Sequence, residues 1–360
     1  MKVLITGGLG NVGQWAVKEC VEKGYEVSVY ELETEKTMKK YDQLSDDLDF
    51  QVIWGDLTNA DHVKQTVEDL QPDVIIHIAA VLAPIAYVIP EIAYNVNIKG
   101  SGHLLKAAEG LENLQKFIFV SSYSVHGPRN PHTTTSKLTG GTPTNPQDNY
   151  GRHKVWMEQQ LQASALTWTI IRLPAVFPVD KDLDADPNAM KFLFILDPDR
   201  NTHGIDARDA GFALANAVEA DTTGRIFDIA GDPKKGWSGT GREITGQLMK
   251  SRGLGASFDS GYRRCDPEVD ESWYYEDWVD PSESQEVLQY QRISFQEHLD
   301  FVSKQMGFMR YILKLIGPII NWQMKRNSPY QDFEGVDSGT TWDAIKEVYD
   351  MEVDEDLMVY

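Results

Sequence analysis

Two side chains four positions apart, Tyr150 and Lys154, could together move a proton. Residues with this spacing share one helix face, so a helix over 150–163 would hold the phenol beside the ammonium. A free tyrosine titrates near about pH 10, but a neighbouring ammonium and a nicotinamide cation would both favour the phenolate. Ser122, just past a predicted strand, could hydrogen-bond the oxygen of a substrate alcohol. These residues predict proton transfer at a carbinol, although the Tyr-Lys spacing alone also arises by chance on surface helices.

A glycine cluster near the amino terminus could hold the phosphates of a dinucleotide. Its sequence is Thr6-Gly7-Gly8-Leu9-Gly10-Asn11-Val12-Gly13. Gly7 would allow the tight turn, Gly10 would let the pyrophosphate approach the backbone, and Gly13 would let the next helix pack closely on the sheet. The helix that begins near Asn11, with Val12 in its first turn, would present free N–H groups to the phosphates.

The end of the second predicted strand carries Glu31, 18 residues beyond Gly13. A carboxylate there could accept hydrogen bonds from the adenine-ribose hydroxyls and would repel a 2′-phosphate, so the sequence favours NAD over NADP. A solvated strand-end charge is the alternative interpretation. Asp56 and Leu57, after the third predicted strand, could meet the adenine, although Gly-Asp is also common in turns.

Strand-like and helix-like segments alternate through the first half of the chain. The predicted strands cover Lys2–Thr6, Glu26–Tyr30, Gln51–Trp54, Val74–Ile78, Lys116–Ser121 and Trp168–Leu173. The predicted helices cover Asn11–Lys23, Ile92–Ala108 and Tyr150–Ala163. Repeated β-α units with apolar strands indicate a parallel sheet covered on both faces. We therefore predict an α/β fold with a Rossmann-type doubly wound parallel sheet over 1–177, completed by returning segments from about 200–230.

The pattern loosens beyond residue 178, where elements are shorter and turns more frequent. A strand is predicted at Arg225–Ile229, and helices are predicted at Arg242–Ser251, Ser282–Leu288 and Phe295–Val302. We expect a smaller C-terminal α+β substrate lobe over 178–305, interleaved with the first domain. Residues 306–360 form an extension.

Composition limits the partners. The 360 residues include 34 Lys and Arg against 55 Asp and Glu, a net charge of −21, which argues against nucleic acid because its phosphates would be repelled. Two cysteines make no disulfide or metal framework, and we predict no metal. The chain opens directly into a strand and has no apolar run of the roughly 18 residues that a membrane span requires. We expect a cytoplasmic protein.

Taken together, the motifs resemble the extended short-chain dehydrogenase/reductase family, which includes NAD-dependent epimerases, dehydratases and hydroxysteroid-type dehydrogenases. The resemblance covers about residues 1–305 and rests on Thr6–Gly13, Glu31, Gly55–Leu57, His77–Ala80, Asn95–Asn97, Val120–Ser122, Tyr150–Lys154 and Arg172–Phe177. It implies a catalytic triad of Ser122, Tyr150 and Lys154, with NAD as cofactor. It also implies a homodimer paired through the helices around 92–108 and 150–163.

The resemblance places further residues along the cofactor, namely Ala79, Ala80, Leu82, Asn97, Pro174 and Val176. For Asn97, a structural hydrogen-bonding role is the alternative. Departures from the family pattern bear on the substrate: Ala175 stands where a common nucleotide-sugar epimerase pattern has asparagine, and His126 where many relatives have tyrosine. The candidate substrate contacts are Ser122, Ser124, His126 and Arg264. Arg264 lies where some relatives clamp a diphosphate, with a charged surface turn as the alternative, and the long stretch 129–147 is predicted to loop over the substrate.

The segment 307–326 is apolar and basic. Three interpretations stay open: a helix at a membrane interface that Pro318 kinks, a lid packed over the substrate lobe, and a partner-binding helix. The tail beyond it is acidic, and Trp342 and Tyr349 could dock it back on the body.

The main prediction is an NAD-dependent oxidoreductase that transfers hydride at a hydroxyl or carbonyl carbon of a small, fairly apolar molecule. One alternative is a nucleotide-sugar epimerase or dehydratase that uses the same oxidation transiently. Tyr123 and Ser124 follow Ser122, so no Asp-Glu pair stands there for dehydration. The other alternative is a non-catalytic NAD-binding sensor, against which the intact serine, tyrosine and lysine argue.

Overall fold

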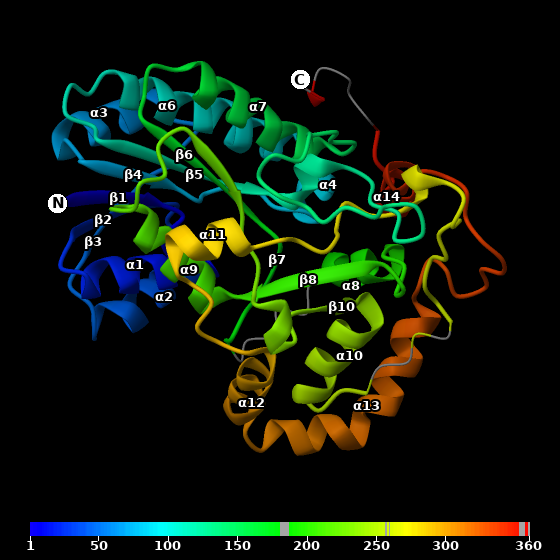
Figure 1. Cartoon of the computed structure of the whole chain (residues 1–360). Helices are drawn as coiled ribbons and strands as arrows, with labels where there is room; N and C mark the ends of the chain where they lie inside the picture. Colours follow the sequence, from blue (N-terminus) through cyan, green and yellow to red (C-terminus); the bar gives the residue numbers. More distant parts are fainter. Residues whose placement is uncertain (181–186, 256–257, 259, 353–356, 359–360) are drawn as a thin grey trace.

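The structure is a computed structural model that describes residues 1–180, 187–255, 258, 260–352 and 357–358. A seven-stranded sheet, parallel throughout, crosses the molecule, and a separate sheet contains three further strands (Figure 1). In spatial order the large sheet contains β3 (Gln51–Trp54), β2 (Glu26–Glu31), β1 (Lys2–Thr6), β4 (Val74–His77), β5 (Lys116–Ser122), β6 (Trp168–Leu173) and β9 (Arg225–Asp228). This confirms the predicted doubly wound α/β fold.

Helices cover both faces of the large sheet because successive strand side chains point to opposite sides. Val3 and Ile5 enter one core and Leu4 the other. The first core is closed by α1 (Gly13–Glu22), α2 (Glu35–Ser45) and α9 (Ala207–Ala217). The second is closed by α3 (Ala60–Leu70), α6 (Ser101–Glu109) and α7 (Asn149–Ala163).

The predicted helix over 92–108 is interrupted. The chain forms α4 (Ile85–Val88) and α5 (Pro90–Tyr94), then a π-helical turn at Asn95–Gly100, and only then α6. Gly100 lies so close to Leu57 that a Cβ there would stand 2.9 Å from the Leu57 Cβ. The wider turn brings Asn97 beneath the segment that follows β4, a placement often made by π-bulges near functional sites.

The chain leaves the large sheet at Pro174, between β6 and β7. The small sheet contains β10 (Ser238–Thr240), β8 (Asn201–Asp206) and β7 (Ala175–Phe177). Helices α8 (Pro187–Ile195), α10 (Gly241–Ser251), α11 (Ser282–Leu288) and α12 (Phe295–Met306) accompany it, with short 3₁₀ turns at Tyr123–His126, Pro233–Lys235 and Asp270–Ser272. After β8 the chain returns to the large sheet, where α9 packs in the first core and β9 pairs with β6.

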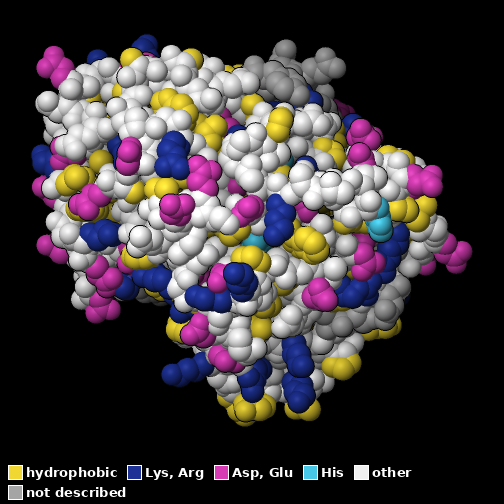
Figure 2. Space-filling view, in the orientation of Figure 1, with side chains coloured by type: hydrophobic (Ala, Val, Ile, Leu, Met, Phe, Trp, Pro, Cys, Tyr) yellow, Lys and Arg dark blue, Asp and Glu magenta, His cyan; other side chains and the backbone are white. Residues whose placement is uncertain are grey.

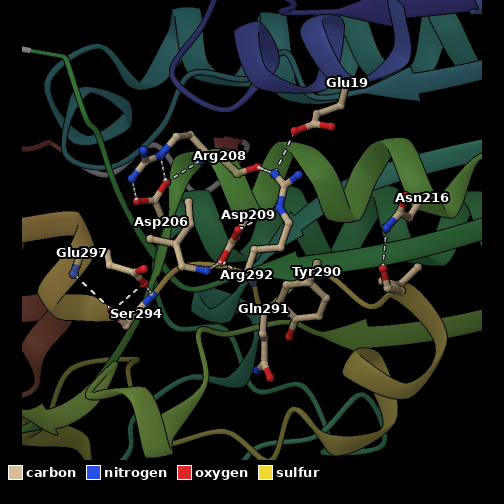
Figure 3. A network of polar contacts seen from close by, with 12 residues as sticks. Glu19, Asp206, Arg208, Asp209, Asn216, Tyr290, Gln291, Arg292, Ser294 and Glu297 are labelled. Atoms are coloured by element: carbon tan, nitrogen blue, oxygen red, sulfur yellow. Dashed lines mark hydrogen bonds and ion pairs between the residues drawn. The ribbon is translucent and has the colours of Figure 1, made fainter. Parts of the chain in front are cut away.

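A polar network ties the segment after α11 back onto the first domain (Figure 3). The Arg292 guanidinium donates to Glu19 of α1 at 2.8 Å, and the Arg292 and Ile293 amides donate to Asp209 at 3.1 and 3.0 Å. The guanidinium also lies 3.6 Å from the centre of the Phe212 ring. Charge-assisted bonds of this kind fix the second lobe against α1 and α9.

The C-terminal extension wraps back over the molecule. Helix α13 (Met309–Arg326) follows α12, and α14 (Thr341–Tyr349) returns to α4 and α8 (Figure 1). The rings of Trp342 and Tyr349 each lie 5.9 Å from that of Tyr87, so both aromatic residues dock the tail as predicted.

Candidate active site

A cavity of about 610 Å³ opens at the carboxyl ends of the parallel strands, where ligands of doubly wound folds bind. Most of the predicted site residues line it: Gly7, Gly10, Asn11, Val12, Gly13, Glu31, Asp56, Leu57, Ala79, Ala80, Leu82, Ser122, Tyr150, Lys154, Pro174 and Val176. Asn97, Ser124, His126 and Arg264 are not among the lining residues in the described part of the chain. Residues from several motifs, spread over 170 positions of the sequence, therefore line one cavity.

The glycine turn has the geometry that each glycine predicts. Gly7 has a φ of +71°, and a Cβ there would stand 2.8 Å from the Ala79 backbone. A Cβ at Gly13 would stand 2.1 Å from the Gly7 carbonyl oxygen, so α1 packs closely on the turn. Among the described residues, a Cβ at Gly10 would have only that same oxygen within 4 Å, at 3.3 Å. The cradle is thus open where a pyrophosphate would approach, and no side chain caps the start of α1.

Glu31 stands at the end of β2 with each carboxylate oxygen holding one backbone N–H. Leu9 donates to Oε2 at 3.0 Å and Leu32 to Oε1 at 3.2 Å. Burial raises the pKa of this carboxyl, while the two N–H groups oppose the shift. Each oxygen retains capacity to accept a ribose hydroxyl.

The cavity wall near Glu31 also contains residues that the sequence did not indicate. Lys36, Thr37 and Lys40 line it from the first turns of α2. The Lys40 ammonium pairs with Asp180 at 3.1 Å and also donates to Gln14. Helix α2 contains no fully buried residue and packs on the first core only through the partly buried Tyr41 and Leu44, so its apolar pattern is short. Its signal is the threonine cap, in which Thr34 and Thr37 satisfy each other's backbone N–H groups.

Ser122, Tyr150 and Lys154 converge at the far end of the same cavity. Tyr150 and Ser122 both line this part of the cavity, and the Lys154 ammonium lies 5.9 Å from the centre of the Tyr150 ring. Lys154 donates to the carbonyl of Val120, on the strand that ends at Ser122, at 2.7 Å. Ser122 itself accepts the Ser124 N–H at 3.2 Å. The strand end and one helical turn therefore hold a hydroxyl, a phenol and an amine together.

Burial dominates the protonation of this trio in the ligand-free protein. It lowers the pKa of Lys154 to about 7, against which the Glu158 carboxylate acts. It raises the pKa of the Tyr150 phenol, a shift that the nearby Ser122 side chain opposes. A cation placed in the cavity beside Tyr150 would favour the phenolate and reverse that direction.

A buried ion pair supports the trio from beneath. Arg172 donates to Glu158 through Nε at 2.9 Å and Nη2 at 2.7 Å, and Ser121 donates to the same carboxylate at 2.6 Å. A bidentate pair of this kind fixes orientation as well as charge. It connects β5, β6 and α7: Ser122 ends β5, Pro174 directly follows β6, and Tyr150 lies on α7. Glu158 belongs to none of the motifs recognised in the sequence.

The structure corrects the placement of Asn97 along the cofactor. Its amide accepts the Val81 N–H at 2.8 Å and donates to the Val81 carbonyl at 2.9 Å. Both functions of the side chain are thereby used on one backbone segment. Asn97 positions Val81, which does line the cavity, and the structural alternative describes this residue.

The candidate substrate contacts other than Ser122 also lie away from the cavity. His126 is buried and its Nε2 is 2.9 Å from Asp228. The Arg264 guanidinium donates to the Phe258 carbonyl and pairs with Asp199 at 3.5 Å. Ser124 hydrogen-bonds Ser122 and so holds the residue that faces the cavity. The predicted loop 129–147 packs against the 266–280 segment and contributes none of the described lining residues.

The C-terminal extension packs in the same apolar cluster as Tyr150. Tyr150 belongs to an apolar cluster that includes Ala344 and Ile345 of α14, with Phe192 and Trp342 packed against it. Asp148 caps α7 by accepting the Gly151 N–H at 2.7 Å and accepts a short hydrogen bond from Tyr87. Burial raises the pKa of Asp148 to about 6. The tail also reaches α7 directly, where the Leu357 carbonyl lies 3.2 Å from the His153 Nε2.

Within the described residues, no group of three or more His, Cys, Asp and Glu side chains could hold a metal ion. No helix in that same part of the chain is long and apolar enough to cross a membrane.

Sequence comparison gives partial matches to known proteins. The chain is 30% identical over 178 residues to a UDP-glucose 4-epimerase of Lactobacillus helveticus, covering 48% of this chain and 51% of that protein. It is 31% identical over 154 residues to an uncharacterized epimerase/dehydratase of Staphylococcus aureus, strain USA300, covering 43% and 45%. The chain thus spans about half the length of the curated relatives it matches.

Structural comparison covers more of the chain. A UDP-glucose-4-epimerase from Stenotrophomonas maltophila, with bound NAD and formylated UDP-arabinopyranose, matches with a TM-score of 0.69 at 17% identity, over 87% of this chain and 99% of that one. A dTDP-glucose 4,6-dehydratase from Bacillus anthracis in complex with NAD gives 0.67 at 16%, over 85% and 96%. At this identity the likeness concerns the fold. The model of the NAD dependent epimerase/dehydratase family matches residues 3–193, more than half of the chain, and the protein belongs to that family.

Proposed function

We propose that this chain is an NAD-dependent oxidoreductase acting at a hydroxyl or carbonyl carbon of a small molecule. The observation that carries the proposal is the convergence of Ser122, Tyr150 and Lys154 on one end of a cavity whose other end is a glycine turn with an open cradle. Membership of the NAD dependent epimerase/dehydratase family supports the same assignment.

The residues of the cavity fit NAD. Gly10 leaves room for the pyrophosphate beside the start of α1, and Glu31 can accept the adenine-ribose hydroxyls. The same carboxylate would repel the 2′-phosphate of NADP. Ala79, Ala80, Pro174 and Val176 line the same cavity as the glycine turn and the trio. Bound there, NAD supplies the acceptor for a hydride from the substrate carbon.

The chain's own side chains handle the proton. Ser122 holds the substrate oxygen by a hydrogen bond, and Tyr150 takes the hydroxyl proton as hydride leaves the carbon. Lys154 lies on the next turn of the same helix, where an ammonium stabilises the phenolate. The Glu158–Arg172 pair keeps α7 in register with β5 and β6 while this happens.

Nucleotide-sugar epimerisation is the second candidate, because several relatives that match about half of the chain are UDP-glucose 4-epimerases. The surroundings of two arginines weigh against it. Arg263 is fully buried and Arg264 pairs with Asp199, so neither contributes a cation to the cavity wall. Incubation with UDP-glucose separates the two candidates: an epimerase forms UDP-galactose without net reduction of NAD, whereas a dehydrogenase reduces NAD with its own alcohol.

Tyr150→Phe tests the proposal. Loss of the general base lowers the rate of hydride transfer by about a hundredfold to ten-thousandfold, while NAD affinity stays near that of wild type. Stopped-flow reduction of NAD and isothermal titration measure the two quantities. Tyr275→Phe is the matched control, since its buried hydroxyl has no hydrogen-bond partner among the described residues. If no member of an alcohol and sugar-nucleotide panel reduces NAD or is epimerised, and the tyrosine variant binds NAD normally, the non-catalytic sensor becomes the better assignment.

The proposed organisation follows the sequence boundaries, with the cofactor domain over 1–177, the substrate lobe over 178–305 and the extension over 306–360. We place the protein in the cytoplasm and propose a homodimer paired through α6 and α7. The tail contact between Leu357 and His153 lies on α7, so the tail would border that interface. Size-exclusion chromatography with light scattering tests the dimer.

A further inference from the structure

Helix α13 exposes a continuous apolar face that the proposed catalytic function does not use. Eight of the seventeen large apolar side chains exposed in the described part of the chain lie between residues 308 and 322. The most prominent are Phe308 at 77%, Leu315 at 81%, Ile319 at 65% and Trp322 at 60%. Their spacing of three, four and seven places them along one side of the helix. Monomeric soluble proteins rarely leave such a patch without a partner.

The opposite side of α13 already has its packing partner in the protein. Gly317 is buried against the backbone of 253–255, and the Asn321 amide donates to the Gly255 carbonyl. Met324 packs on a cluster that contains Phe258 and Tyr262. The contacts that hold α13 to the rest of the protein therefore use one side of the helix and leave its apolar face exposed.

Charge distinguishes α13 from the remainder of the molecule. Residues 301–331 contain five basic side chains and no acidic one: Lys304, Arg310, Lys314, Lys325 and Arg326. The chain as a whole carries −21, so all other residues together carry −26. In Figure 2, apolar side chains project along the lower edge, where α13 lies, with lysine and arginine side chains beside them.

The aromatic and basic groups on α13 occur in pairs. The Arg326 guanidinium lies 5.4 Å from the Trp322 ring centre, and that of Arg310 lies 5.3 Å from the Tyr311 ring centre. Aromatic rings with cations next to them suit the boundary between acyl chains and headgroups, where the ring is half-buried and the charge meets phosphate. Eighteen residues with Arg310 and Lys314 in the first half are unsuited to spanning a bilayer.

We propose that α13 lies in the plane of a bilayer surface and binds anionic lipid through its outward face. Phe308, Leu315, Ile319 and Trp322 enter the acyl boundary, and the basic side chains meet the lipid phosphates. A second copy that docked by the same helix would bring its own five basic side chains against these. A neutral lipid surface would offer no net negative charge to attract the five basic side chains near α13.

Vesicle sedimentation of the full-length protein tests the proposal. We expect it to pellet with vesicles of equal parts phosphatidylglycerol and phosphatidylcholine at low salt, to pellet less at high salt, and to stay in solution with phosphatidylcholine alone. L315E/I319E lowers the partition coefficient by more than about tenfold. K314Q/R326Q keeps the apolar face and lowers binding to the anionic vesicles by about thirtyfold at low salt.

The matched control F333E/V336E places two acidic residues at exposed apolar positions outside α13 and binds like wild type. All variants are first compared with wild type by thermal unfolding and NAD titration, which keeps the outcome independent of the catalytic proposal. Failure of wild type to pellet with anionic vesicles at low salt overturns the proposal, as does wild-type binding by L315E/I319E. Light scattering that shows self-association abolished by L315E/I319E, without vesicle binding, assigns the face to a second copy instead.

Discussion

Arg263 should control whether the C-terminal extension stays beside Tyr150. Its buried guanidinium donates to Asp337 at 2.6 Å, to Thr341 at 3.0 Å and to the carbonyls of Ser272 at 2.7 Å and Gly339 at 2.6 Å. Three of these four partners lie within or directly before the first turn of α14. Arg263→Met keeps much of the side-chain volume and removes every one of these bonds.

The free-energy cost of Arg263→Met depends on the groups that lose their hydrogen bonds to the guanidinium. Removing one member of a buried ion pair costs about 3–5 kcal/mol because the other charge loses its compensation. The Asp337 side chain is 25% exposed and can be partly rehydrated, so the lower end applies. A loss of about 3 kcal/mol raises the population of a locally opened 337–349 segment by about a hundredfold.

Hydrogen exchange followed by mass spectrometry measures that opening directly. Amides of α14 should exchange about a hundredfold faster in R263M, while those of β1 and β5 keep wild-type rates. The neighbouring R264M is the control, because a partly exposed pair contributes about 1 kcal/mol or less and its partners lie outside the extension. Since α14 packs in the cluster that contains Tyr150, R263M should also weaken substrate binding and spare NAD. Unchanged exchange in α14, or equal acceleration in R264M, would refute the clamp.

Two further predictions concern the cofactor and the buried amine. Glu31→Gln should weaken NAD binding by about tenfold to a hundredfold, which corresponds to the loss of one charged hydrogen bond. It should also reduce the preference for NAD over NADP, measured as the ratio of their dissociation constants. Titration with both dinucleotides checks this, and an unchanged ratio contradicts it. Lys154 has a pKa lowered to about 7 when folded, so above pH 7 the unfolded chain holds a proton that the folded protein has lost. Stability should therefore rise with pH between about pH 7 and 10, and Lys154→Met should remove that rise in denaturant titrations of the ligand-free protein; parallel pH slopes for the two proteins would be inconsistent with a buried neutral amine.

The site residues could be predicted from the sequence where those that act together lie within a few positions of one another. Gly7, Gly10 and Gly13 lie within one turn, and the geometry each adopts follows from the missing Cβ. Tyr150 and Lys154 share one helix, whose spacing alone brings the phenol and the amine together. The six segments predicted as strands in the first half match the observed strands within one residue. Four of them, β1, β4, β5 and β6, are buried along almost their whole length, and such burial on both faces favours a mostly apolar run.

The sequence offered little guidance where the partner of a side chain lies on a distant segment. Asn97, in the π-helical turn, is hydrogen-bonded to the backbone of Val81. The His126 ring is hydrogen-bonded to the carboxylate of Asp228, 102 residues away. Helix α9 was not predicted because it is rich in alanine, which gives only a weak apolar pattern. Its alanines are buried in the core that α1 also closes. Polar and small residues carry little pattern of their own, so their partners decide what they do.

The sequence by itself determined that a phosphate cradle, a strand-end serine and a tyrosine-lysine turn occur in an order that parallel strands bring to one edge. Only the tertiary structure decided which arginine binds the C-terminal segment, and that α14 closes on Tyr150 while α13 keeps an apolar face outward. The physical reason is that local motifs encode backbone geometry within a few residues. Burial and ion pairing, in contrast, are settled between segments that meet only after the chain has folded.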